Sequence, residues 1–278
     1  MQPAPYLILT DSLSWCMYDG LSFCCHSERN VVKSKNLISM EKIYKYIEEH
    51  ASVPSQALDW VVKQTHVRTN HARMLSGATQ GQLLRMLVQM TGARRILELG
   101  TFTGYSAICL ASALPEGGHL DTLELNDELE DLILEGFDRA GLSDRMELHI
   151  GDCKETLKSF RERMNLPDVG ESSSLKDAEM SQMTESAASD DLLYDIVYID
   201  ANKREYCEYY DLVFDMVRPG GLILADNVLW DGKVCQDPLP QDKQTLGIAT
   251  FNDKVSADPR VESVILPLRD GLNIIRKK

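Results

Sequence analysis

No stretch of the sequence approaches the run of about 18 consecutive apolar residues that a transmembrane helix requires, so we expect no membrane-spanning helix. Basic residues are in deficit as well: 29 lysines and arginines face 43 acidic residues, for a formal net charge of −14. Nucleic acids and anionic membrane surfaces are bound through basic patches. The charge balance therefore argues against both as partners, and a solvated acidic surface is its ordinary explanation.

Cysteine motifs are missing too. The seven cysteines include no CxxC pair, and none has histidine partners at zinc-finger spacing. An odd, scattered set of this kind is typical of a reducing compartment. The amino-terminal end lacks a basic segment ahead of an apolar core, and Asp11 interrupts the one short apolar stretch. We therefore predict no secretory signal and a cytoplasmic location.

The length of 278 residues is enough for one large α/β domain. Residues 1–36 mix aromatics, serines and cysteines without sustained periodicity, and we interpret them as a poorly ordered extension ahead of a domain spanning 37–278. Residues 166–191 hold seven acids, one lysine, six serines and no aromatic residue. Such a segment buries too little apolar surface to offset its ordering entropy, so it is predicted to be a disordered insertion.

Apolar periodicity predicts three helices, at 40–50, from about 54, and at 78–90, ahead of an alternation of strands and helices. Strands are predicted at 95–99, 120–124, 146–150, 194–199 and 221–225, with helices at 106–114, 127–140, 154–164, 204–217 and 247–257. Two last strands, 261–266 and 272–275, are joined through Arg269-Asp270-Gly271, a turn signal for an antiparallel hairpin. The alternation indicates an α/β fold with a doubly wound, mostly parallel sheet and helices on both faces.

A glycine-containing turn follows the first predicted strand, in the run Glu98-Leu-Gly100-Thr-Phe-Thr-Gly104-Tyr-Ser106. Glycines here let the backbone approach a ligand and open the next helix amino terminus toward it. The GxxxG spacing differs from the GxGxxG of dinucleotide-binding proteins, which approach a pyrophosphate more tightly. A packing turn without a ligand is the alternative.

Acidic residues also follow the next two strands. Glu124 closes the second strand, where a carboxylate can accept both ribose hydroxyls of an adenosine-containing ligand. A surface acid at a strand end is the alternative there. Asp152 and Cys153 close the third strand, where an adenine edge would lie. Asp152 is equally well placed to be only a helix N-cap.

Oxygen-bearing side chains end the fourth and fifth strands, Asp200 on one and Asp226-Asn227 on the other. Neighbouring parallel strands place their ends about 5 Å apart, so these side chains converge at one rim. Each alone is more often a cap or turn residue, but together they describe a hard-cation site of the Mg²⁺ type. Lys203 lies three residues beyond Asp200. A cation and a sulfonium nearby would disfavour its ammonium form, which makes it a candidate base rather than a solvated lysine.

These features resemble one family, the cation-dependent O-methyltransferases of the caffeoyl-CoA and catechol type, which use S-adenosylmethionine and have a Rossmann-like fold. The resemblance covers about residues 37–278 and depends on five runs. They are Gly77-Ala-Thr-Gln-Gly-Gln82, Glu98 to Ser106, Tyr198-Ile-Asp-Ala-Asn-Lys203, Gly220 to Gly232, and Phe251-Asn with Ala257-Asp-Pro-Arg-Val261.

The resemblance implies roles for single residues. A divalent cation, with Mg²⁺ expected, would be held by Asp200, Asp226 and Asn227, and Lys203 would act near the reacting hydroxyl. The cofactor pocket would be lined by Ser76, Glu98, Gly100, Ser106, Glu124, Asp152, Cys153 and Asp200. Asp231 would lie beside the substrate, and a homodimer is implied by the resemblance alone. Trp230 is a candidate for the roof of the substrate mouth, although an aromatic residue after a strand is as often part of the core. Asn202 and Asp231 depart from the plant pattern, which often has Asp and Asn there, so the substrate is less defined than the reaction.

The predicted reaction moves the methyl group of S-adenosylmethionine to one hydroxyl of a vicinal dihydroxyphenol. Chelation by the cation would lower the pKa of that hydroxyl, and Lys203 would accept its proton. The acidic chain lacks an evident basic patch for a CoA phosphate, which favours uncharged catechols over hydroxycinnamoyl-CoA esters. Two alternatives are an NAD-type oxidoreductase, which the GxxxG spacing disfavours, and a catalytically silent binding protein, which retention of the cation ligands disfavours.

Overall fold

The computed structural model describes residues 40–167 and 192–278. The described residues up to Ser52 belong to one unit of the chain, and those from Val53 to Lys278 form a second, compact unit. Helix α1 (Met40–Glu49) belongs to the first unit, and the sheet belongs to the second. The predicted extension over 1–36 lies outside the described residues, as does the predicted insertion over 166–191 apart from its first two residues. Both remain predictions.

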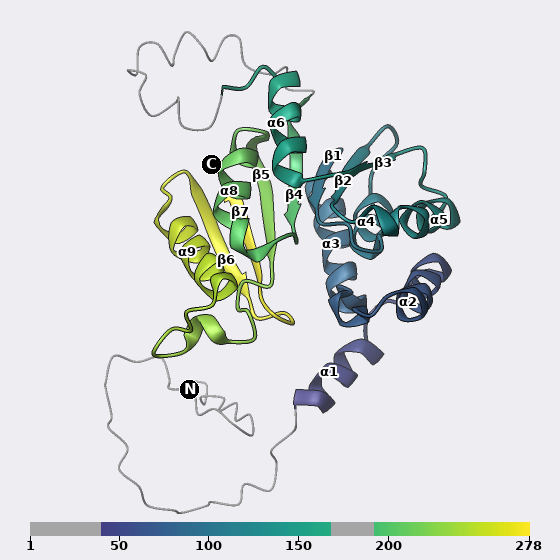
Figure 1. The fold of residues 1–278 in the computed structure, drawn as a ribbon. Coiled ribbons are helices and arrows are strands. Elements are labelled where there is room, and N and C mark those ends of the chain that lie inside the picture. Colours follow the sequence, from purple (N-terminus) through teal and green to yellow (C-terminus); the bar gives the residue numbers. More distant parts are fainter. Residues whose placement is uncertain (1–39, 168–191) are drawn as a thin grey trace, which may run out of the picture. The chain divides into compact units, whose positions relative to one another are not determined.

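Seven strands form one sheet, in the order β3-β2-β1-β4-β5-β7-β6 (Figure 1). The pairs from β3 to β5 are parallel, whereas β7 runs antiparallel to both β5 and β6. The predicted α/β fold with a terminal antiparallel hairpin is therefore confirmed. The strands are β1 (Arg95–Leu99), β2 (His119–Glu124), β3 (Met146–Ile150), β4 (Tyr194–Ile199), β5 (Val217–Asp226), β6 (Val261–Leu266) and β7 (Leu272–Lys277).

Helices cover both faces of this sheet (Figure 1). Alternate residues of the strands face opposite sides, and two buried clusters result. In the first cluster, Leu97 and Leu99 of β1 pack with α6 (Cys153–Arg163), α8 (Tyr206–Phe214) and α9 (Lys243–Ala257). In the second, Ile96 packs with α2 (Gln56–Arg68), α3 (Gly77–Thr91), α4 (Tyr105–Ala111) and α5 (Glu130–Ala140). Among the described residues, no helix has the length and apolar character needed to cross a membrane.

Capping side chains account for where several helices begin. The second helix, expected near Pro54, starts at Gln56 because the Ser55 hydroxyl accepts a hydrogen bond from the Leu58 N–H. Helix α9 starts at Lys243, four residues before the predicted position, because Asp242 caps the Thr245 N–H at 3.0 Å. Periodicity alone did not reveal this cap.

The segment between α8 and β5 corrects one predicted boundary. The predicted helix over 204–217 is shorter in the structure. A 3₁₀ turn occupies Lys203–Glu205, α8 then runs from Tyr206 to Phe214, and Val217 already belongs to β5. Pro219 has no N–H for a sheet ladder, and the register of β5 against β4 shifts between Tyr194 and Ile196. This irregularity lets the strand begin four residues before the predicted Gly221.

Candidate active site

The turn after β1 brings three strand ends together. The N–H of Gly100 donates to the Leu123 carbonyl of β2 at 2.9 Å, and the N–H of Asp200 donates to the Leu99 carbonyl at 2.8 Å. Gly100 has a φ of +95°, and a Cβ there would overlap the backbone carbonyl of Asp200. Only glycine allows this approach. The turn therefore sets the backbone of β1 directly against the end of β4.

Glu98 is a fully buried carboxylic acid on β1. Its Oε2 accepts a hydrogen bond from the Thr122 hydroxyl at 2.5 Å, whereas no described group bonds to its buried Oε1. Burial raises the pKa of Glu98 to about 8, although the neighbouring Ser106 and Thr122 hydroxyls act to lower it. A buried, half-satisfied acid of this kind is suited to a cationic ligand group.

Glu124, at the end of β2, is held by backbone N–H groups. Its Oε2 accepts from Phe102 at 2.7 Å and its Oε1 from Asn126 at 2.9 Å. A carboxylate has about four lone-pair sites, so both oxygens can still accept ligand hydroxyls. Glu124 therefore links the turn after β1 to the turn after β2.

The remaining residues predicted for the cofactor pocket are distributed over three helix starts. Asp152 is the N-cap of α6 and accepts from the Lys154 and Glu155 N–H groups at 2.8 and 3.3 Å, so its structural role is observed. Cys153 follows it, and burial raises the pKa of this thiol to about 12. Ser76, just before α3, and Ser106, in the first turn of α4, are both buried.

Two carboxylates meet at the ends of β4 and β5. Ile199 pairs in register with Ala225, so Asp200 and Asp226 follow side by side. The Lys203 ammonium donates to Asp200 Oδ1 at 2.6 Å. Burial raises the pKa of Asp200 to about 6, with Lys203 acting to lower it and the Asp226 carboxylate acting to raise it. Asp200, Asp226 and Lys203 thus form one compact group of charges.

Two buried residues that the sequence did not single out hold Asp226 in place. Gln80 of α3 donates through Nε2 to Asp226 Oδ2 at 2.7 Å and to the Tyr198 hydroxyl at 2.9 Å. Tyr198 donates to the same Oδ2 at 3.1 Å. The Tyr206 hydroxyl lies 2.9 Å from the Asp226 carbonyl. Gln80 belongs to one of the runs that carry the family resemblance, which was the available signal.

The loop after β5 has a run of left-handed backbone. Asn227, Trp230 and Asp231 have φ values of 58°, 48° and 52°, a conformation that costs free energy for residues other than glycine and is frequent at functional sites. The Asp231 N–H donates to Asp270 Oδ1 at 2.6 Å, so the hairpin turn between β6 and β7 supports this loop. Asp231 is exposed, and Trp230 packs partly buried with its Nε1 unpaired among the described residues.

A second polar group lies at the opposite, amino-terminal ends of the strands. His119 and Asp121 of β2 face Glu147 of β3, and suitable ligand atoms of the three lie within 4.8 Å of one another. Sequence reasoning missed this group. The available signal was the alternation His-x-Asp and Glu-x-His on neighbouring strands.

A parallel sheet with a glycine turn, a strand-end acid and paired carboxylates at its carboxyl rim defines an α/β enzyme of the nucleotide-cofactor class. The O-methyltransferase family profile matches residues 48–170 and 168–278, and the chain belongs to this family. It is an S-adenosylmethionine-dependent O-methyltransferase, as predicted. Membership of this family argues against the first alternative, an NAD-type oxidoreductase.

Relatives with known names and structures agree with this assignment. The chain is 31% identical over 253 residues to caffeoyl-CoA O-methyltransferase 1 of Arabidopsis thaliana, covering 88% of each chain. It superposes on the Bacillus cereus O-methyltransferase in complex with S-adenosylhomocysteine with a TM-score of 0.67 and 28% identity, covering 85% of this chain and 97% of that one. The O-methyltransferase TomG of Streptomyces achromogenes, in complex with S-adenosylmethionine, gives 0.68 and 26%, with 85% and 96% covered.

Proposed function

We propose that this enzyme methylates one hydroxyl of a vicinal dihydroxyphenol and that it does so with a divalent cation, Mg²⁺ by preference. The observation that carries the proposal is the side-by-side placement of Asp200 and Asp226 at the ends of paired strands, with Lys203 bonded to Asp200. If the protein ligands hold the cation from one side, its other side can bind two adjacent oxygen atoms of the substrate.

The donor set fits a hard cation. Asp200, Asp226 and Asn227 offer two carboxylates and an amide oxygen, the ligands that Mg²⁺ prefers. Both carboxylates are largely enclosed: the side chain of Asp200 is 18% exposed and Asp226 is 2% exposed. Adjacent buried carboxylates repel, and a dication would offset that repulsion. A cation bound here would lower the pKa of a coordinated hydroxyl.

Lys203 is proposed as the base that takes the hydroxyl proton. Its side chain is 11% exposed and its ammonium is paired with Asp200 in this structure. A lysine accepts a proton only as the neutral amine. A cation that neutralises Asp200 would release Lys203 from this pair, so that its Nζ could face the substrate hydroxyl.

The proposed cofactor pocket fits S-adenosylmethionine. The unpaired Glu98 Oε1 would meet the ammonium of the methionine part, and Glu124 would accept the ribose hydroxyls. Gly100 lets the turn between them lie directly against the end of β4. Ser76, Ser106, Asp152, Cys153 and Asp200 complete the set that we propose lines this pocket. S-adenosylmethionine supplies the electrophilic methyl group on its sulfonium.

The decisive experiment is a panel of phenols assayed with labelled S-adenosylmethionine and Mg²⁺. Catechols should be methylated once, whereas the matched monophenols should react at least about 100-fold more slowly, because only a vicinal pair can chelate. Equal rates for catechols and monophenols would contradict the chelation geometry while leaving O-methyl transfer intact.

A second substrate class deserves its own arm of the panel. Relatives at about 30% identity are named caffeoyl-CoA O-methyltransferases, and caffeoyl-CoA also carries a vicinal diol. The net charge of −14 favours the uncharged catechol, because a CoA phosphate calls for basic side chains. We therefore expect a lower kcat/KM for caffeoyl-CoA than for caffeic acid alkyl esters.

The cofactor affinity should depend on pH through Glu98. Its pKa of about 8 keeps it mostly protonated at pH 6 without ligand, and a cationic ammonium beside it favours the carboxylate. Binding then releases a proton, so S-adenosylmethionine affinity should rise with pH, by up to about tenfold per unit between pH 6 and 7.5. Calorimetric titration measures this.

The control for that titration is Glu98→Gln, which preserves the shape of the side chain. It should bind the cofactor about tenfold or more weakly at pH 7.5 and lose the pH dependence. A wild-type affinity that stays constant over this range would show that Glu98 meets no cationic group.

Gln80 should matter to the cation without touching the substrate. Gln80→Met removes the donor to Asp226 Oδ2 while keeping a similar volume. Losing an outer hydrogen bond to a metal ligand typically costs about 10- to 100-fold in metal affinity. The Mg²⁺ concentration for half-maximal activity should rise by that amount, with kcat largely restored at saturation. Gln82→Met, on the same helix, is the matched control and should change neither value.

A further inference from the structure

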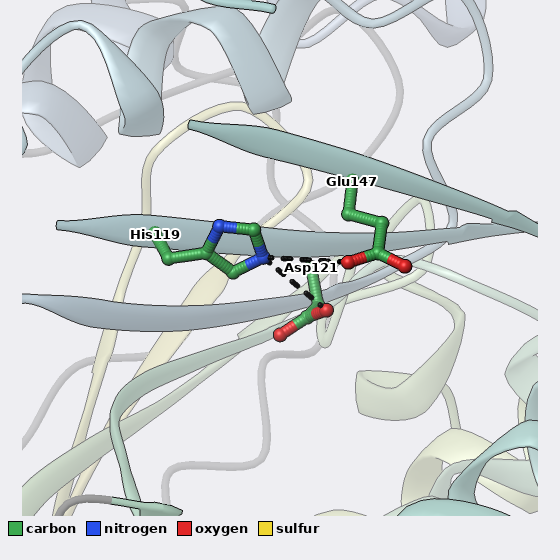
Figure 2. A group of neighbouring side chains, drawn as sticks. All are labelled: His119, Asp121 and Glu147. Carbon is green, nitrogen blue, oxygen red and sulfur yellow. Dashed lines mark ion pairs between the residues drawn. The ribbon is translucent and has the colours of Figure 1, made fainter. Parts of the chain in front are cut away.

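The amino-terminal ends of β2 and β3 carry four polar side chains on one face of the sheet. His119 and Asp121 are two residues apart on β2, and Glu147 and His149 are two residues apart on β3. Asp121 pairs in register with Glu147. Because side chains two apart share a face, all four point to the same side. Figure 2 shows the His119 ring directed at both carboxylates.

The distances in this group suit ligands around one cation. His119 Nε2 lies 3.6 Å from Asp121 Oδ1 and 3.8 Å from Glu147 Oε2. Both separations are longer than a hydrogen bond. Ligand atoms around tetrahedral Zn²⁺, with bonds of about 2.0–2.2 Å, lie about 3.4 Å apart. The candidate ligand atoms of all three residues lie within 4.8 Å of one another, so side-chain rotations would bring them to bonding distance of a shared ion.

Asp121 is built as a fixed ligand. It is 6% exposed, and its Oδ2 accepts from the Tyr194 hydroxyl at 2.9 Å and lies 3.9 Å from the Arg95 guanidinium. Its Oδ1 accepts from His149 Nε2 at 2.9 Å and faces His119. Metal-bound carboxylates are commonly held by such outer hydrogen bonds. Burial acts to raise the pKa of Asp121, but the surrounding donors hold it below its ordinary range.

The fourth position around such an ion would be open. The three candidate ligands line a partly open pocket of about 380 Å³. Phe160 of α6 and Met164, which follows the last residue of that helix, also line it. The side chains of His119 and Glu147 are 33% and 61% exposed, so an ion can enter from solvent. A site with three protein ligands and one free position is the arrangement of reactive rather than purely structural zinc.

This group is separate from the proposed catalytic cation site. It lies at the amino ends of the strands, whereas Asp200 and Asp226 lie at the carboxyl ends. From His119 to Glu124, β2 alone spans about 16 Å at about 3.3 Å per residue. One ion cannot serve both groups.

We propose that His119, Asp121 and Glu147 form a second cation site, selective for Zn²⁺ or a similar imidazole-binding transition metal. One imidazole and two carboxylates suit such metals, whereas Mg²⁺ and Ca²⁺ take oxygen ligands only. The two rims of the sheet thus select different cations, Mg²⁺ at the carboxyl ends and a transition metal at the amino ends.

The test is Zn²⁺ titration by calorimetry on the full chain after chelator treatment, in excess Mg²⁺. An Asp200→Asn, Asp226→Asn background removes the catalytic cation site from the measurement. We expect one equivalent of Zn²⁺ to bind in this background, and His119→Gln and Glu147→Gln each to weaken it by about 100-fold. Both substitutions fall on partly exposed side chains, so the fold should be retained, which circular dichroism checks. Asp121 is left intact because it supports Tyr194.

The matched controls are His66→Gln and Glu128→Gln, both exposed and outside the group. They should leave Zn²⁺ affinity unchanged. In the otherwise native chain, Glu147→Gln should leave Mg²⁺-supported methyl transfer unchanged. No saturable Zn²⁺ binding in the background chain, or binding that persists equally in His119→Gln and Glu147→Gln, would overturn the proposal.

Discussion

Asp226→Ala and Asp200→Ala are each expected to lower kcat for catechol methylation by at least about 10³-fold, because a Lewis-acid cation contributes several kcal/mol to the barrier. EDTA should abolish the activity of the wild-type enzyme, and Mg²⁺ should restore it. Asp226→Ala should retain S-adenosylmethionine binding, because the cofactor would be held mainly by the ends of β1 and β2. Asp200 borders both proposed sites, so its substitution is the less selective of the two.

Stability must be separated from catalysis in these variants. Asp226→Ala leaves the Gln80 amide and the Tyr198 hydroxyl without their shared acceptor, which costs about 1–3 kcal/mol. Asp226→Asn keeps an oxygen for both donors and should fold normally, yet it should still lose most activity because the negative charge is gone. Undiminished turnover in EDTA would remove the cation from the proposed chemistry altogether.

Lys203→Met should lower kcat by about 10² to 10⁴-fold, the usual range for loss of a general base. Cation and cofactor affinity should change little. The loss should shrink for catechols with electron-withdrawing groups, since their hydroxyls ionise without help. The measurement is kcat across a series of substituted catechols, with kcat plotted against the pKa of the substrate hydroxyl.

Lys158→Met is the matched control for that series, because Lys158 is a solvent-exposed lysine on α6 that pairs with Glu155. It should leave kcat unchanged for every catechol. Near-normal kcat of Lys203→Met on an unactivated catechol, at every pH tested, would mean that the cation alone ionises the substrate. Lys203 would then act only as a positioning residue beside Asp200, at the carboxyl ends of the strands.

Local patterns in the sequence were sufficient for most of the fold. Strand β4 and the hairpin strand β6 begin and end where the period-two pattern predicts, at Tyr194–Ile199 and Val261–Leu266. Errors fell where capping or packing competes with periodicity, as at Asp242 before α9 and at Val217, which begins β5 rather than ending a helix. Both depend on contacts that the local pattern does not contain.

The convergence of Asp200 and Asp226 also followed from sequence, because parallel strands of one sheet place their carboxyl ends at one rim. The residues that hold these carboxylates could not be read in the same way. Gln80 reaches Asp226 across 146 positions of chain, and Lys203 was assigned to the rim without its bond to Asp200. The periodicity of a helix predicts on which face of that helix Gln80 lies, but it does not identify the residues that pack against that face.

The amino-acid sequence by itself determined the order of strands and helices, the glycine turn at Gly100 and the strand-end positions of Asp200 and Asp226, because each depends on residues close together in the chain. The tertiary structure alone decided that β7 inserts between β5 and β6, that Gln80 and Tyr198 hold Asp226, and that His119 meets Glu147. Each of those contacts joins distant segments. Their formation depends on how two helix layers pack on a twisted sheet, which the pattern within one segment does not specify.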